Sequence, residues 1–265
     1  MMSTLAIGWA AASGFGALGG SGIRIASPDG ATPLSAAAAP FTHTVKNFAR
    51  FTLEAKLTCA AAAAALTAAG MNPPEGERVN LGIVGTGWGG CLAANAAYFR
   101  DYVENGRTLG RGNLFIYTLP TSALAEACIH LGLSGPALHV SATANPLAAS
   151  VDATLDLLAG GQADGMLAVW HDGSVSLAAL LAEGRTGPGL DAFAPAWLRD
   201  WNGSLPEMIA CLTKRSQAPG TAREAARPPE RPGLRVECET PASRDSARCS
   251  ADNPCEAFPD GKGGR

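Results

Sequence analysis

The chain has 265 residues, of which 47% are hydrophobic and 16% are charged, values that describe a folded chain with a sizeable core. Twenty Lys and Arg stand against 23 Asp and Glu, and the resulting formal charge of -3 leaves no basic surplus for a nucleic-acid backbone. The most apolar run, Cys59 to Ala69, is shorter than the roughly 20 residues that span a bilayer. It predicts a buried helix and no membrane span.

Short β-type runs alternate with helical runs through the first 211 residues. The sequence predicts strands at 5–9, 79–84, 114–117, 138–141 and 166–170, and helices at 53–69, 93–104, 122–131 and 146–158. Gly70 and Gly132 suit the left-handed position beyond a helix end, Ser122 suits a helix N-cap, and Pro146 suits a first helical turn. The alternation predicts an α/β layered fold with a buried, largely parallel sheet.

The composition of the chain changes near residue 212. From there to the end Pro, Arg and Ser are frequent, large apolar residues are few, and 10 basic residues accompany 8 acidic ones. Such a composition buries too little apolar surface to fold alone. We therefore predict an N-terminal domain over residues 1–175, a helical extension over 176–211, and a disordered tail over 212–265.

Two features bear on the compartment and on metal binding. The apolar stretch from Leu5 to Gly20 has no Lys or Arg ahead of it and is interrupted by glycines, unlike a secretory signal. The seven cysteines are odd in number and include no Cys-x-x-Cys pair, which fits neither a disulfide framework nor a zinc site. We expect reduced thiols, a cytoplasmic location and no metal.

A glycine-rich turn is the most conspicuous motif. Gly85, Gly87 and Gly90 satisfy G-x-G-x-x-G between an expected strand and an expected helix, which is the setting of a dinucleotide site. That site also requires an acidic residue about 20 positions later, and the run 116–119 has none. Tight backbone geometry is therefore the favoured reason for these glycines, and no cofactor is expected. A dinucleotide-binding α/β module stays open as an alternative function.

Four consecutive segments are similar to a known family. Residues 78–87 read RVNLGIVGTG, 98–106 read YFRDYVENG, 114–120 read LFIYTLP and 129–136 read IHLGLSGP. Their order and spacing resemble the N-terminal half of β-ketoacyl synthases. The resemblance extends from about Thr4 to Gly173 and is nearest to divergent synthase-like proteins, including chain-length factors, of aryl-polyene and related polyketide or fatty-acid pathways. It implies the N-terminal half of a thiolase-like fold.

The resemblance also implies where catalysis would occur. Active members carry a Cys on a sharp turn between a strand and the following helix, where helix-end N–H groups favour the thiolate. Counting eight residues beyond Pro136 places that position at Ala144, and the sequence contains no cysteine between Cys128 and Cys211. The candidate residues of this turn and of the acyl pocket beside it are Ser141, Thr143, Ala144 and Asn145.

Besides the cysteine, the resemblance implies histidines in the active site of a condensing enzyme. The second half of a synthase normally contributes two of them, whereas nothing after Gly173 resembles those motifs and His171 is the last histidine of the sequence. We interpret each of the four histidines as a polar residue that neighbouring groups satisfy, namely His43, His130, His139 and His171.

The resemblance thus implies an accessory protein without condensing activity of its own. Its expected partner is a complete synthase subunit or a second copy of the chain, with an acyl carrier protein as a further partner. The turn at residues 143–145 would shape an acyl tunnel, with its length set by the bulk of Phe115, Tyr117 and Leu119. The remaining alternative is an acyltransferase or condensing enzyme that uses the hydroxyl of Ser141 or Thr143, or a residue of the partner.

Overall fold

The computed structural model describes residues 2–19, 35, 39–71, 73–87, 91–108, 110–141, 145–183 and 195–217. Contacts divide the chain into the units Met1–Pro229 and Glu230–Arg265, and every described residue belongs to the first. The expected disordered tail lies almost entirely outside the described residues, as do Gly90, Thr143 and Ala144. The boundaries expected for the three parts of the chain therefore stay a prediction.

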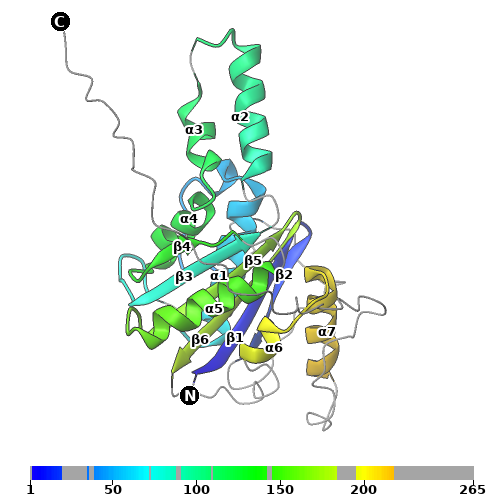
Figure 1. The fold of residues 1–265 in the computed structure, drawn as a ribbon. Coiled ribbons are helices and arrows are strands. Elements are labelled where there is room, and N and C mark those ends of the chain that lie inside the picture. The colour runs from blue at the N-terminus through cyan, green and yellow to red at the C-terminus, as the bar shows by residue number, and fades with distance from the viewer. Residues whose placement is uncertain are drawn as a thin grey trace, which may run out of the picture. The chain divides into compact units, whose positions relative to one another are not determined.

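A six-stranded sheet forms the centre of the fold, with the strand order β2-β1-β6-β5-β3-β4 (Figure 1). Its strands are β1 (Met2–Ala11), β2 (Gly14–Gly19), β3 (Leu81–Gly87), β4 (Ala137–His139), β5 (Gly165–Asp172) and β6 (Val175–Glu183). Strand β3 is parallel to β4 and to β5, whereas the other neighbouring pairs are antiparallel. The predicted α/β class is confirmed, but the sheet is mixed rather than largely parallel.

Two hairpins account for this difference. Strands β1 and β2 are separated only by Ala12 and Ser13, and strands β5 and β6 only by Gly173 and Ser174. A two-residue loop can join only antiparallel strands, because a parallel connection needs a crossover of a dozen residues or more. The φ of 58° at Gly173 is a conformation that glycine adopts without strain.

Four of the longer helices cover the two faces of the sheet, namely α1 (Leu53–Ala68), α4 (Ser122–Leu131), α5 (Pro146–Ala159) and α7 (Leu205–Gln217). The fifth, α2 (Leu92–Glu104), contacts α3 and η3 instead of the strands. Shorter turns of helix are η2 (Phe48–Arg50), α3 (Gly112–Phe115), η3 (Ile116–Thr118) and α6 (Pro195–Arg199). The left-handed Gly70 and Gly132 follow α1 and α4, and Pro146 opens α5, as predicted.

Successive side chains of the strands point to opposite faces, which gives the domain two cores. Ile83 and Leu167 pack with α1 and α4 on one face. Val84 and Ala168 pack with α5, α6 and α7 on the other, where Figure 1 shows α5 lying across the sheet. The sheet is therefore buried on both sides, which explains the near-continuous apolar runs in its central strands.

Helix α1 is the alanine-rich run of the sequence, and it is buried on every side from Leu57 to Leu66. It lies so close to β1 that a Cβ on Gly8 would overlap the backbone oxygen of Ala61 and the backbone nitrogen of Ala65. Only small side chains fit between two backbones at this separation. The alanine run is thus explained by close helix-to-sheet packing, as expected for a helix that is apolar all round.

Three local predictions are wrong. Residues 114–117 are helical in α3 and η3, because β4 occupies the position beside β3 and Tyr117 packs into the core instead. The expected helical extension over 176–211 begins with strand β6 rather than with a helix. Ser122 is the first residue of α4 rather than its N-cap, and its hydroxyl donates to the carbonyl of Ile116.

Within the residues that the structure describes, no single helix combines the length and apolarity needed to cross a membrane. One bent pair, Gly112–Thr118 with Ser122–Leu131, meets those two criteria together across a bend of 102°.

Candidate functional site

The carboxyl ends of β3, β4 and β5 meet at one edge of the sheet, because these three strands are parallel to one another. Open α/β sheets commonly bind ligands in the crevice at this edge. The glycine turn leaves β3 here, and the turn before α5 leaves β4 here. The two sequence motifs therefore converge on the same edge of the domain.

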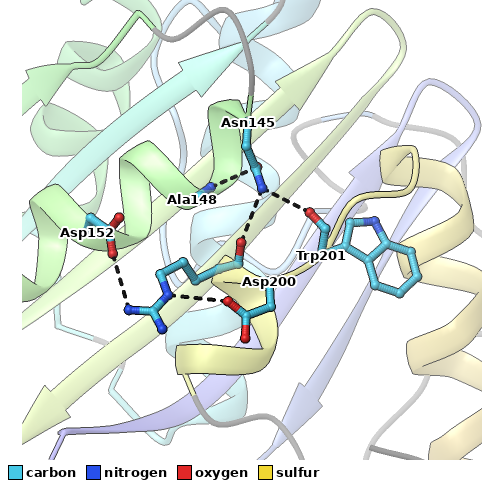
Figure 2. Close-up of polar contacts among 6 residues, drawn as sticks. Asn145, Ala148, Asp152, Asp200 and Trp201 are labelled. Atoms are coloured by element: carbon cyan, nitrogen blue, oxygen red, sulfur yellow. Dashed lines mark hydrogen bonds and ion pairs between the residues drawn. The ribbon is translucent and has the colours of Figure 1, made fainter. Parts of the chain in front are cut away.

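Asn145 is the best-defined residue of the turn before α5. Its Oδ1 accepts a hydrogen bond from the backbone N–H of Ala148 at 3.1 Å, so its side chain caps the helix. Its Nδ2 donates to the carbonyl oxygens of Arg199 and Trp201, both at 3.2 Å. Figure 2 shows this side chain between the first turn of α5 and the end of α6. One amide group thus ties the turn to a segment more than 50 positions later.

Other contacts surround this junction. The Arg199 guanidinium lies 3.9 Å from Asp152 and 3.4 Å from Asp200 (Figure 2). These three side chains are about half exposed, at 46%, 55% and 59%, so the ion pairs contribute little stability. The rings of Trp197 and Trp201 pack with their centroids 5.2 Å apart. The Asn145 hydrogen bonds and this aromatic contact are what position the turn.

The described residues place no base beside the hydroxyl of Ser141, the serine of the enzyme alternative. Ser141 is exposed, and the structure assigns its side chain no hydrogen-bond partner among the described residues. A serine hydroxyl needs an adjacent base to become a nucleophile. Thr143 and Ala144 lie outside the described residues, so their roles stay predictions.

Packing explains two of the three motif glycines. A Cβ on Gly85 would lie 2.6 Å from the side chain of Leu124, and one on Gly87 would lie 2.7 Å from the backbone oxygen of His171. Neither glycine has the positive φ that would mark a special turn conformation. Close approach of β3 to α4 and β5 is therefore a sufficient reason for both glycines. This agrees with the interpretation that the motif serves tight backbone geometry rather than a dinucleotide.

The histidines do not behave alike. His130 pairs with Glu126 and His43 lies 3.3 Å from the Thr42 hydroxyl, as expected of locally satisfied groups. The Nδ1 of His171 is buried without a partner among the described residues, which corrects the expectation for that residue. Burial lowers the pKa of His171 to about 4, so its imidazole is neutral at physiological pH.

Two hydroxyl groups are buried near the end of β5 that carries His171. The Ser176 hydroxyl, on β6 opposite His171, has no partner within the described part of the chain. The Thr86 hydroxyl, on β3, has none there either, but Thr86 pairs with Trp170 and therefore lies on the other face of the sheet. The sequence did not link Ser176 with His171, because strand pairing, rather than spacing along the chain, brings them together.

The residues expected to set an acyl pocket do not form one wall. Tyr117 is buried and its hydroxyl donates to Glu126 at 2.9 Å, whereas Phe115 and Leu119 are 53% and 57% exposed. The expectation assumed a strand over 114–117, where alternate residues share a face, and this segment is helical.

An exposed apolar surface lies on α2, α3 and η3. Helix α2 buries none of its residues, and Leu92 and Phe99 on it are 68% and 64% exposed. Phe115 and Ile116 add exposures of 53% and 49%. Figure 1 shows α2 and α3 extending away from the sheet. We call these four residues, with Val103 and Leu119, the α2–α3 face.

No three His, Cys, Asp or Glu residues of the described part are grouped so that they could hold a metal ion. No protein-family model matches the sequence. No curated protein matches it either.

The structure is similar to solved structures. A β-ketoacyl synthase from Burkholderia phymatum matches with a TM-score of 0.51 at 13% identity, over 69% of this chain and 59% of that chain. The ishigamide ketosynthase/chain length factor matches with a TM-score of 0.49 at 13% identity, over 69% and 62%. A ketosynthase (ApeO) in complex with its chain length factor (ApeC) from Xenorhabdus doucetiae matches at 0.47 and 16% identity, over 75% and 92%.

The likeness to the Burkholderia phymatum enzyme shows a shared fold. It confirms the expected α/β class, with the fold of that synthase over the matched part of the chain. This chain spans only 59% of the length of the Burkholderia phymatum synthase and 62% of the ishigamide ketosynthase/chain length factor.

Proposed function

We propose that this chain is a cytoplasmic, non-condensing accessory protein of the β-ketoacyl-synthase type, which acts beside a complete synthase subunit in fatty-acid or polyketide biosynthesis of the aryl-polyene type. The observation that carries the proposal is the turn before α5, where the synthase fold would present a cysteine and this sequence has none between Cys128 and Cys211. Without a thiol the turn cannot form a thioester with an acyl chain.

The nucleophile of the family could align with either of two neighbouring residues of this turn, Ala144 or Asn145. Neither of them supports covalent chemistry. The position at which the resemblance places the nucleophile, counted along the sequence, is Ala144, whose methyl group is inert. The residue that engages the N–H groups at the start of α5 is Asn145. Its carboxamide is not a nucleophile, and its amide nitrogen is already bound to two carbonyl oxygens. Both candidate positions therefore lack a group that accepts an acyl chain.

The α2–α3 face supports a protein partner. A helix on the surface of a globular protein normally buries one apolar stripe against the core. Helix α2 buries no residue, and its Leu92, Phe99 and Val103 are exposed to solvent. Large apolar side chains gathered on one exposed helix are suited to an interaction site. We propose that a complete synthase subunit covers this face, and that an acyl carrier protein delivers substrate to the partner rather than to this chain.

A binding experiment tests the proposal. The chain is co-expressed with a complete β-ketoacyl synthase from the same organism and analysed by size-exclusion chromatography with light scattering. We expect a hetero-complex for the wild type and its loss in the double variant Phe99→Asp/Phe115→Asp. Leu53→Asp is the matched control, because Leu53 is also an exposed apolar residue, at 46%, but lies outside the α2–α3 face.

The outcomes separate the proposal from its rivals. A wild-type chain that elutes alone with every synthase tested would contradict it, as would a complex that the double variant leaves intact. Carrier-dependent turnover that disappears in Ser141→Ala would favour the enzyme alternative. Nucleotide binding lost in Gly87→Val would favour the dinucleotide alternative, although the contact with His171 makes that variant one to check for folding first.

A further inference from the structure

A cavity of about 510 Å³ lies on the domain away from the two motifs. Its walls come from three segments, residues 43–46, the loop 74–78 before β3, and residues 128–133 at the end of α4. None of its lining residues belongs to the glycine turn, the turn before α5 or the α2–α3 face. Its size is within the ~300–1,000 Å³ that is usual for small-molecule sites.

His130 forms the most firmly held part of the wall. Its side chain is 14% exposed, and its Nε2 lies 3.5 Å from the carboxylate of Glu126. Glu126 in turn accepts the hydrogen bond from Tyr117, and the ring of Phe51 packs 5.6 Å from the imidazole. These contacts fix the ring and occupy one nitrogen. The other nitrogen, Nδ1, has no hydrogen-bond partner among the described residues and is the one left to a ligand.

Positive groups gather around this imidazole. Burial lowers the pKa of His130, Glu126 raises it, and His43 and Lys46 lower it further through their charges. Arg78 lines the same cavity from the loop before β3. The structure assigns neither Lys46 nor Arg78 an ion pair within the described residues. Four nitrogen groups from three segments thus line one cavity, and neither permanent cation is held in an ion pair by the described residues.

The cavity lining carries both signs of charge. Glu75, Glu77, Lys46 and Arg78 are all exposed, whereas His43 and His130 are partly buried. The two cations and the two carboxylates therefore lie at the rim, where water screens them, and the imidazoles lie deeper. A ligand that carries both an anionic group and a hydroxyl or ammonium group matches this mixed lining.

We propose that this cavity binds the phosphate group of a small phosphorylated metabolite. A phosphate offers several acceptor oxygens to donors converging from different directions, as Arg, Lys and imidazole groups do here. The exposed carboxylates of Glu75 and Glu77 are suited to hydroxyl or ammonium groups on the rest of the ligand. The site is independent of the proposed partner and of the turn before α5.

Isothermal titration of the full chain with inorganic pyrophosphate tests the site. We expect saturable binding of one pyrophosphate per chain, with an affinity about tenfold lower in Lys46→Met and in Arg78→Met, since each variant loses a charged hydrogen-bond donor. Lys214→Met is the charge-matched control, because Lys214 is exposed on α7 and does not line the cavity. Its affinity should equal that of the wild type.

A second arm uses sulfate, whose charge does not change near neutral pH. An anion favours imidazolium, so we expect sulfate to bind more tightly at about pH 6 than at about pH 8, and His130→Gln to reduce this difference. Absence of saturable pyrophosphate binding at about 10 mM ligand would overturn the proposal. So would equal losses of affinity in Lys46→Met and Lys214→Met, which would indicate only general attraction to positive charge.

Discussion

Replacement of Asn145 by alanine measures how firmly the turn before α5 is held. The variant loses the cap on α5, which contributes about 1 kcal/mol, and two hydrogen bonds to the carbonyls of Arg199 and Trp201, which contribute about 1 kcal/mol each. Water can reach the partly exposed carbonyls and offsets part of this loss. We therefore expect a decrease of about 2 kcal/mol in the free energy of unfolding.

Urea denaturation followed by circular dichroism measures this change. With an m-value of about 2 kcal/mol/M, the midpoint should fall by about 1 M while m stays constant. Asn145→Ser keeps a capping oxygen but loses both donors, so its midpoint should lie between those of the wild type and the alanine variant.

The matched control is Asn105→Ala, which removes an exposed amide that donates to the carbonyl of Asp101 at 2.8 Å. Its effect should stay below about 0.5 kcal/mol, as for most surface changes. An Asn145→Ala effect as small as the control would refute the inference that this amide ties α5 to α6.

Three further outcomes follow from the packing and from the buried titratable groups. Gly8→Ala should destabilise the domain by about 3 kcal/mol in the same urea assay, because the added Cβ would overlap the backbone of α1. Gly112→Ala is the control and should be neutral, because a Cβ there would meet open space. Equal effects of the two variants would contradict the close packing of β1 on α1. Burial raises the pKa of Glu54 from its ordinary 4.5 to about 7, so its contribution to stability is full below pH 4.5 and is lost as the pH rises to about 7. Glu54→Gln should therefore be more stable than the wild type at about pH 8 and not at about pH 4, and an advantage independent of pH would refute the assignment. Burial lowers the pKa of His171 from 6.5 to about 4, so the stability that it contributes above pH 6.5 is lost as the pH falls toward 4. His171→Gln should therefore lose less stability than the wild type between pH 6.5 and pH 4. Parallel plots of unfolding free energy against pH for the two proteins would count against a buried neutral imidazole.

Patterns confined to one segment predicted much of the fold. The buried run ending at Gly70 and the helix opened by Pro146 are both where spacing and capping residues place them. The segment 114–117 is different, because a short apolar run is compatible with either a strand or a helix. Which one forms depends on whether a neighbouring strand is available, and β4 already occupies that edge. Strand direction likewise depended on the two-residue loop after Asp172.

The candidate site was predicted in part. The resemblance named Asn145 as a residue of the turn, but its bonds to Arg199 and Trp201 cross more than 50 positions and leave no signal in the sequence. The unpartnered Nδ1 of His171 depends on strand pairing in the same way. Apolar residues on α2 resemble an ordinary buried stripe, and only the structure shows that nothing in the described part covers them. Long-range contacts, rather than local propensities, decide these features.

Intact-mass spectrometry tests the central claim most directly. The complex of this chain with a complete synthase is incubated with an acyl-loaded carrier protein, and the masses of both subunits are measured. We expect the synthase to gain one acyl group, which serves as the internal control, and this chain to keep its unmodified mass. An acyl group bound to any side chain of residues 140–145 of this chain would contradict the account.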